Sequence, residues 1–166
     1  MHIRIRRIAV IIKTRYTIIK ETNALLPAKQ IDYDTIVIER SRILYIKQTP
    51  FQIIQTSCQK YWSTYEGRRD AVVALMNFKQ KVPIPISIHK AIYLFPTHSP
   101  NHLDNSWIAY EHVARFDKKQ SPGQPEQTLV TFKNGYTLTL DVSVHTFEKQ
   151  WQRTFELMYK SGRIGL

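Results

Sequence analysis

The chain has 166 residues, which suits a single domain, and its 43% hydrophobic content is enough for a buried core. Lys and Arg outnumber Asp and Glu by 24 to 13, which gives a formal net charge of +11. Such a basic chain favours a polyanionic partner, most often nucleic acid, with the membrane surface as the alternative.

The first twenty residues are strongly basic and contain no acidic residue. Their apolar run, Ile8–Ile12, is shorter than the roughly 7–15 residues of a secretory signal, and no segment approaches the ~18 apolar residues of a membrane span. The single cysteine, Cys58, excludes an internal disulfide and fits a reducing compartment. We therefore expect a cytoplasmic protein that makes no membrane contact.

Residues 1–14 form a basic leader with three open interpretations: a basic arm that stays disordered, an edge strand, or a start-site extension. Residues 15–166 are expected to form one domain. Short strands are predicted at Tyr16–Lys20 and, after Pro50, at Phe51–Gln55, and another segment between them is closed by Pro27. A hairpin is predicted from the apolar alternations Thr35–Glu39 and Ile43–Lys47.

A helix is expected from Gly67 to about residue 77, because apolar residues recur there at helical spacing. Arg68 and Arg69 fall in its first turn, where cations oppose the helix dipole. That misfit hints at another role for both arginines. The alternating prolines of Val82–Ile86 favour an extended segment next.

Residues 93–149 read as one unit of paired strands and a final helix. Trp107 and Ala109 fall on one face of a strand and Ile108 on the other, while Asn134-Gly135 is a strong hairpin signal. Two loops, residues 98–105 and 143–145, then lie at strand ends, where a rigid sheet can present them to a partner.

The last helix is predicted over residues 144–160, with a core-facing stripe of Phe147, Trp151, Phe155 and Met158. Residues 118–126 read as a flexible tip between two strands. The fold class expected from these elements is α+β, with mostly antiparallel sheets, a mid-chain helix and a C-terminal amphipathic helix.

Nothing in the sequence supports catalysis or a bound metal or cofactor. Pro100 prevents the helix that would align His98 and His102 as metal ligands, and Cys58 lacks any flanking signature of a nucleophile. A glycine-rich phosphate loop and a nucleophile elbow are both missing. We therefore expect a protein that is not an enzyme.

The basic residues, with the polar loops beside them, favour a nucleic acid as the partner, and double-stranded DNA is what the family resemblance given below implies. Lys and Arg would neutralise phosphates, and Asn, Ser and His could bond base edges or fix position through the backbone. The candidate DNA-binding residues are Asn105, Ser106, His145, Lys149, Arg68, Arg69, Lys118, Lys119 and Arg153. RNA is another candidate, because Tyr61, Trp62 and Tyr65 could stack on bases, although the same aromatics also suit a core or interface.

Several separated motifs occur along the chain from Tyr16 to Ile164. They are Asn23-Ala24 with Leu26-Pro27, Ser57-Cys58, Tyr65-Glu66-Gly67-Arg68, Tyr93-Leu94-Phe95-Pro96-Thr97, Trp107-Ile108, His112-Val113, Val130-Thr131-Phe132, Asn134-Gly135, Phe147-Glu148-x-Gln150 and Arg153-Thr154. With these motifs the chain resembles the bacterial competence transcription factor family, ComK. Their order and spacing together are more specific than any one of them.

The resemblance implies an activator of DNA-uptake genes that binds paired A/T-rich boxes through the minor groove as a homo-oligomer. It also implies work with RNA polymerase at the nucleoid and turnover through a Clp-protease adaptor. The sequence stops at Leu166, without the longer C-terminal tail of well-known members, which puts activation and adaptor-mediated turnover in doubt. The alternative is a tail-less regulatory protein that pairs with a full-length activator or acts as a proteolysis decoy.

A weaker, fold-level resemblance is to the LytTR class of DNA-binding domains, which read DNA with loops on a sheet. The residues that carry it are Asn105-Ser106-Trp107-Ile108, the Asn-Gly hairpin and Ser143-Val144-His145. It implies DNA contacts at Asn105 and His145. Histidine stands where that class usually has a basic residue, so the contact at His145 would depend on pH.

Overall fold

The structure, a computed structural model, describes residues 11–164, and within them three α-helices and ten strands give the expected α+β fold. The larger sheet has the strand order β1-β4-β3-β2-β7-β6-β5 and is antiparallel except between β1 and β4. Its strands are β1 (Ile12–Lys13), β2 (Thr22–Pro27), β3 (Thr35–Glu39), β4 (Ile43–Ile46), β5 (Ile84–Ser87), β6 (Ile92–Pro96) and β7 (Trp107–Ala109).

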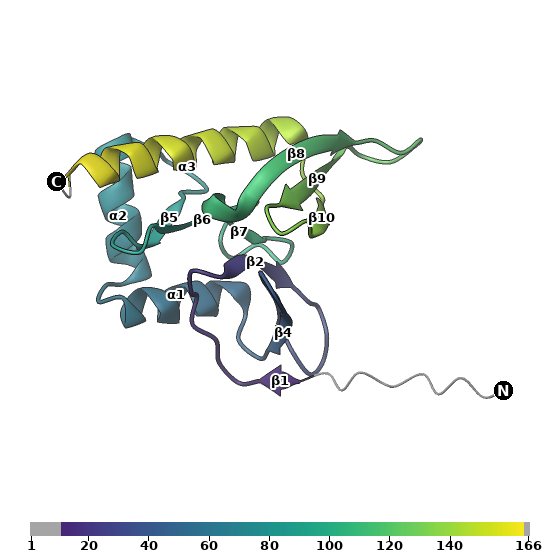
Figure 1. Cartoon of the computed structure of the whole chain (residues 1–166), viewed down its shortest axis with the longest axis horizontal. Coiled ribbons are helices and arrows are strands. Elements are labelled where there is room, and N and C mark those ends of the chain that lie inside the picture. The colour runs from purple at the N-terminus through teal and green to yellow at the C-terminus, as the bar shows by residue number, and fades with distance from the viewer. Residues whose placement is uncertain (1–10, 165–166) are drawn as a thin grey trace.

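A second, antiparallel sheet follows a short 3-10 turn at Tyr110–His112 and has the order β10-β9-β8. Its strands are β8 (Val113–Lys119), β9 (Gln127–Phe132) and β10 (Thr137–Leu140). Gly135 turns the chain between β9 and β10 at a positive φ of 90°, as the Asn-Gly signal predicts. Figure 1 shows the β8–β9 hairpin projecting beyond the body of the molecule.

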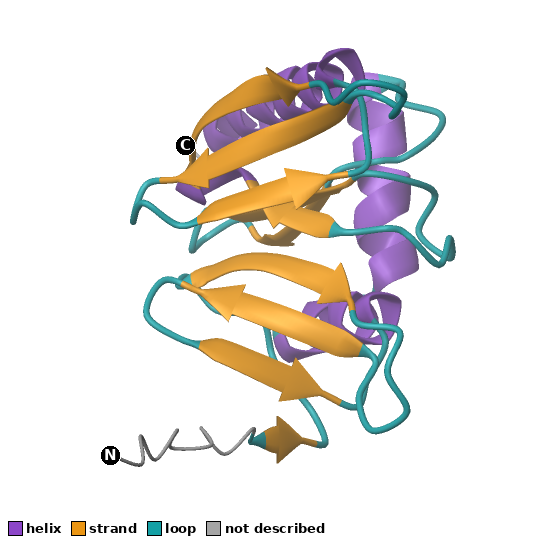
Figure 2. Cartoon of the chain, turned by 90° about the vertical axis from the view of Figure 1, so that its right-hand side faces the viewer, coloured by secondary structure: helices purple, strands orange, loops and turns teal. Residues whose placement is uncertain are grey.

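The three helices are α1 (Pro50–Lys60), α2 (Tyr65–Met76) and α3 (Val144–Ile164). Figure 1 shows α1 and α3 on opposite sides of the molecule with α2 running between them, and Figure 2 shows the helices behind the strands. One core packs α1 and α2 against the larger sheet and contains Trp107 and Ala109. Ile108 faces a second core, shared with the smaller sheet and Phe147, so the predicted alternation is confirmed.

Two predicted strands are wrong. Residues 51–55 belong to α1, because Thr49 and Gln52 exchange side-chain bonds with each other's N–H in a capping box, and Pro50 favours the first helical turn. Residues 16–20 form an irregular segment whose backbone is bonded by other elements. The Ile18 N–H, for example, donates to Ser57 Oγ at 3.0 Å.

The helix predicted from Gly67 begins two residues earlier, because Thr64 caps it by accepting the Gly67 N–H at 2.9 Å. The final helix extends to Ile164, and its predicted core stripe is only partly right. Phe147 is buried, but the Phe155 side chain is 53% exposed. The buried stripe instead runs through Gln150, Thr154, Leu157 and Ser161. Three of these residues are polar, so a search for apolar residues at helical spacing does not detect them.

The predicted leader contributes one described element. Ile12 and Lys13 form β1, a short edge strand that runs parallel to β4. Residues 1–10 lie outside the described residues, so the other interpretations of the leader stay predictions.

Candidate nucleic-acid interface

The predicted loop 98–105 is closed at its base by hydrogen bonds. The Thr97 N–H donates to the Ser106 carbonyl at 2.9 Å, and the Ser106 N–H donates to Thr97 Oγ1 at 3.0 Å. The His98 N–H donates to Asn105 Oδ1 at 2.9 Å. Asn105 and Ser106 are both buried. The structure therefore shows both as residues that shape the loop from within.

The outward part of this loop carries two stacked imidazoles. The ring centroids of His98 and His102 are 5.0 Å apart. Burial lowers the pKa of His98, and the nearby His102 and Lys81 lower it further. Gln150 Nε2 donates to the carbonyls of both Lys81 and Pro96, so the base of this loop lies near the segment between α2 and β5.

The second predicted loop leads directly into the N-terminus of α3. Ser143 Oγ accepts the Thr146 N–H at 3.2 Å, which caps the first turn. No acidic residue occupies this turn, whereas His145 and Lys149 lie exposed on its first two turns. The positive end of the helix dipole and these basic side chains therefore meet at one place.

A cleft of about 630 Å³ lies between residues 77–81 and this end of α3. Among the described residues, no Asp or Glu lines the cleft. Its basic lining residues are Lys79, Lys81, His145, Lys149 and Arg153. It thus joins three of the predicted site residues with two lysines that the sequence analysis missed.

Arg153 and Gln150 bind the backbone of the cleft's opposite wall. Arg153 Nη2 donates to the Gln80 carbonyl at 2.9 Å, and its Nη1 lies 3.5 Å from the Lys81 carbonyl. Its guanidinium lies over the Phe78 ring, 4.1 Å from the centroid, and burial lowers its pKa. Gln150 Nε2 donates to the Lys81 carbonyl at 2.7 Å.

The remaining predicted cations lie in two other places. Lys119 Nζ donates to Thr139 Oγ1 at 3.3 Å, and Lys118 lies 3.9 Å from the Glu126 carboxylate, both on the β8–β9 hairpin. Figure 1 places this hairpin on the same side as the start of α3. Arg68 and Arg69 lie at the N-terminal end of α2, one helix length from residues 77–81, and Arg68 Nη2 donates to the Tyr61 carbonyl.

The three aromatic residues proposed for base stacking lie in different surroundings. Tyr65 is buried against Phe51, and the half-buried Tyr61 packs against the core and donates its hydroxyl to the Ile18 carbonyl at 2.9 Å, so both are tied to the protein body. Trp62 is 97% exposed. A continuous stacking platform of all three is therefore not formed.

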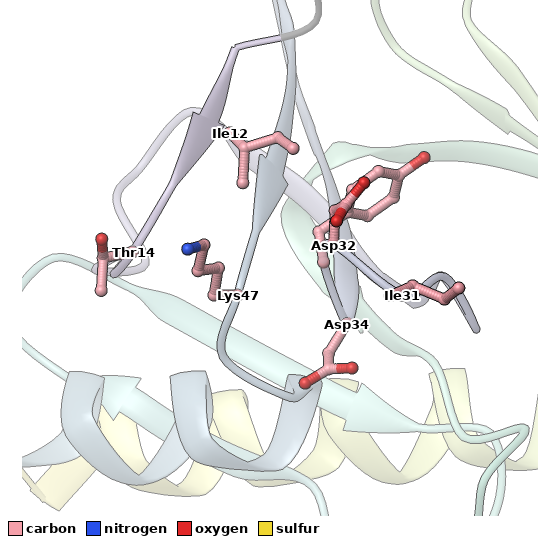
Figure 3. A pocket seen from close by; sticks show the side chains of 7 residues that line it. Ile12, Thr14, Ile31, Asp32, Asp34 and Lys47 are labelled. Carbon is pink, nitrogen blue, oxygen red and sulfur yellow. The ribbon is translucent and has the colours of Figure 1, made fainter.

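Another hollow, of about 480 Å³, lies beside β1 at the far edge of the larger sheet. Figure 3 shows Ile12 and Thr14 on one side of it, Asp32 and Asp34 on the other, and Lys47 between them. The two carboxylates make this hollow a poor place for a nucleic acid.

Within the described residues, no cluster of three or more His, Cys, Asp or Glu is arranged to hold a metal ion. None of the helices in residues 11–164 is long and apolar enough to cross a membrane.

Comparison with known proteins gives the chain its family. A sequence profile described as "ComK protein" matches residues 13–163, nearly all of the chain. The chain belongs to the ComK family. A curated ComK-like relative, the "Competence transcription factor" of Bacillus subtilis (strain 168), is 34% identical over 124 residues, 75% of this chain. The chain spans 62% of that relative's length.

The predicted ComK resemblance is thereby confirmed. No solved structure matches the chain, and the weaker likeness to LytTR domains gains no support. The relative is named as a transcription factor and not as an enzyme, which agrees with the absence of catalytic motifs from the sequence.

Proposed function

We propose that this ComK-family protein is a sequence-specific DNA-binding activator of competence genes. The observation that carries the proposal is the acid-free basic cleft beside loop 98–105, at the start of α3. A polyanion would meet the charges of Lys79, Lys81, Lys149 and Arg153 and the positive end of the helix dipole there. The name of the B. subtilis relative supports the same role.

The finer part of the proposal is recognition of paired A/T-rich boxes through the minor groove. A narrow A/T groove has an enhanced negative potential and attracts Lys, Arg and His side chains. His145 and the outer residues of loop 98–105 are the proposed readers, with Asn105 and Ser106 holding the loop in shape. Lys118, Lys119, Arg68 and Arg69 are assigned to outer phosphate contacts.

Binding of paired boxes requires more than one protomer, and an aromatic stripe on α3 supports self-association. Trp151 stacks on Tyr110 at 5.3 Å between ring centroids, and Phe155 follows one turn later with 53% of its side chain exposed. Exposed apolar stripes of this kind mark interaction sites. The occupant that we assign to it is a second copy of this chain.

The proposal places the protein on the nucleoid in the cytoplasm, in contact with RNA polymerase and regulated by a Clp-protease adaptor. Contact with RNA polymerase follows from an activator role, which the relative's name supports, and the adaptor is what membership of the ComK family implies.

Fluorescence anisotropy with an A/T-boxed and a scrambled G/C-rich duplex, across a salt series, tests the function. We expect at least a hundredfold preference for the boxed duplex, lost in an Asn105→Ala, His145→Ala double variant. Equal affinity for both duplexes, with a steep salt dependence, would reduce the protein to a non-specific polyanion binder.

A second candidate function is that of a regulatory protein that pairs with a longer relative without activating transcription. The exposed Phe155 and Trp62 side chains favour it, because large exposed aromatics are common centres of protein interfaces. Specific promoter binding without transcription in a purified system would favour this candidate. Transcription from the same template would favour the activator.

A further inference from the structure

We propose that the cleft between residues 77–81 and α3 is the groove that holds the DNA backbone, with Lys79, Lys81 and Lys149 as its phosphate-binding groups. We assign Arg153 and Gln150 as positioning residues that hold the two loop lysines opposite Lys149. This inference rests on the proposed function and assigns the phosphate-binding groups of the same site.

The segment that carries Lys79 and Lys81 depends on α3 for its shape. It leaves α2 through Asn77, at a positive φ of 57°, and enters β5 after Lys81, at a positive φ of 49°. Positive φ is unfavourable for a side chain such as that of lysine. Strain of this kind persists only where surrounding contacts enforce it.

Those contacts come from two neighbouring side chains of α3. Arg153 binds the carbonyls of Gln80 and Lys81 and covers the Phe78 ring, while Gln150 binds the Lys81 carbonyl and accepts from Arg153. A planar guanidinium can bond two carbonyls and stack on a ring at once, which an ammonium group cannot do. The Arg153 side chain is therefore used to fix the loop.

The three lysines share one cleft and carry no ion pair there. Among the described residues, neither Lys79, Lys81 nor Lys149 forms an ion pair. Other described cations, such as Lys60 and Lys133, are also without an ion pair, so the shared cleft is what distinguishes these three lysines. Unpaired lysines on both walls of an open cleft suit a chain of phosphates.

The chemistry of the lining indicates backbone contact and not base reading. Lysine is a flexible point charge that binds phosphates without selecting a base. Base discrimination is therefore left to loop 98–105, beside the groove, and to His145 among its lining residues. The groove sets affinity and its salt dependence.

The test measures anisotropy binding and its salt dependence for variants of the full chain. Lys79→Ala with Lys81→Ala should make the negative slope of log K against log salt shallower by about 1 for each lysine. The preference for the A/T-boxed duplex should not change. Lys60→Ala with Lys133→Ala removes the same charge from exposed sites outside the cleft and should leave the slope within about 0.5 of the parent value.

Arg153→Ala should make the slope shallower by about 2 or more, although it removes only one charge, because both loop lysines lose their positions. Arg153→Lys keeps the charge and should not restore the slope. Adding Arg153→Ala to the double-lysine variant should lower it by at most about 1 further, and such non-additivity is not expected of a merely structural residue. Far-UV circular dichroism at each salt concentration checks that every variant is folded.

Equal slopes in the double-lysine variant and its control would overturn the groove assignment, whatever Arg153→Ala does. If Arg153→Ala does not fold, Lys79→Glu with Lys81→Glu takes its place, and unchanged binding there has the same consequence. An unaltered parent that binds both duplexes equally would instead contradict the proposed function. A failure of the groove assignment is thus distinguishable from a failure of the proposed function.

Discussion

The side-chain amide of Gln150 donates to the carbonyl of Pro96 at 2.8 Å and so joins α3 to the last residue of β6. The same Nε2 donates to the Lys81 carbonyl, which fixes one wall of the basic cleft. Gln150 is 2% exposed, and its bond to Pro96 is buried, whereas its bond to Lys81 is partly buried at the cleft. One buried amide therefore sets where α3 lies on the sheet and where the cleft's loop lies on α3.

Gln150→Leu is expected to lower the free energy of unfolding by about 1–3 kcal/mol, because the buried Pro96 carbonyl loses this donor and the Lys81 carbonyl loses its shorter bond. Urea unfolding followed by tryptophan fluorescence measures this change. Gln152→Leu, at an exposed position of the same helix, is the control and should have an effect within about 0.5 kcal/mol of zero. Equal stabilities of the two variants would contradict a bonding role for Gln150.

Asn105→Ala is expected to open loop 98–105, because the His98 N–H loses its acceptor. The free energy of unfolding should fall by about 1–3 kcal/mol, and the His98 amide should exchange with solvent faster than in the parent. Asn101→Ala, on the exposed part of the loop, is the matched control. Full stability of Asn105→Ala combined with lost DNA specificity would show instead that Asn105 contacts DNA directly.

Trp62→Gly is expected to stabilise the protein. Trp62 occupies the position after the C-cap of α1 at a φ of 65°, and its N–H and that of Ser63 bond back to Gln59 and Cys58. Glycine is the preferred residue in this motif. Since the tryptophan side chain is 97% exposed, little packing is lost, and the gain should be about 1 kcal/mol.

Thermal unfolding of Trp62→Gly measures the gain, and Trp62→Ala is the control because it removes the ring but keeps the strained φ. A melting temperature that rises equally in both variants would assign the effect to the ring and not to the backbone. Weakened binding of a partner by both variants would identify Trp62 as an interface residue.

Burial raises the pKa of the Cys58 thiol to about 11. The folded state therefore disfavours the thiolate, so this contribution to stability is complete below the unfolded pKa and is lost as pH rises through the folded value. We expect stability to decline between about pH 9 and 11, and to decline less in Cys58→Ser, whose hydroxyl does not titrate there. A thiol reagent at pH 8 should label Cys58 only after denaturation, and rapid labelling of the folded protein would contradict this.

Local signals in the sequence were enough for much of the fold. The Asn134-Gly135 turn, the period-2 pattern around Trp107 and the alternation in β3 and β4 depend on neighbouring residues, and each is confirmed. The segment at 51–55 was missed because the decisive signal was polar: Thr49 and Gln52 form a capping box. Apolar periodicity alone does not detect such a cap.

For the candidate site, the sequence determined the charge, the family motifs and the basic residues of α3. Only the tertiary structure brings the basic residues of α3 together with the two loop lysines, because α3 crosses the α2–β5 segment about 70 residues away in the chain. The residues are His145, Lys149 and Arg153 on α3 and Lys79 and Lys81 on the loop. Whether a polar side chain binds a partner molecule or holds a loop of the protein in place depends on which buried groups it can hydrogen-bond. The sequence displays the donors and acceptors, and the packing of distant elements assigns their partners.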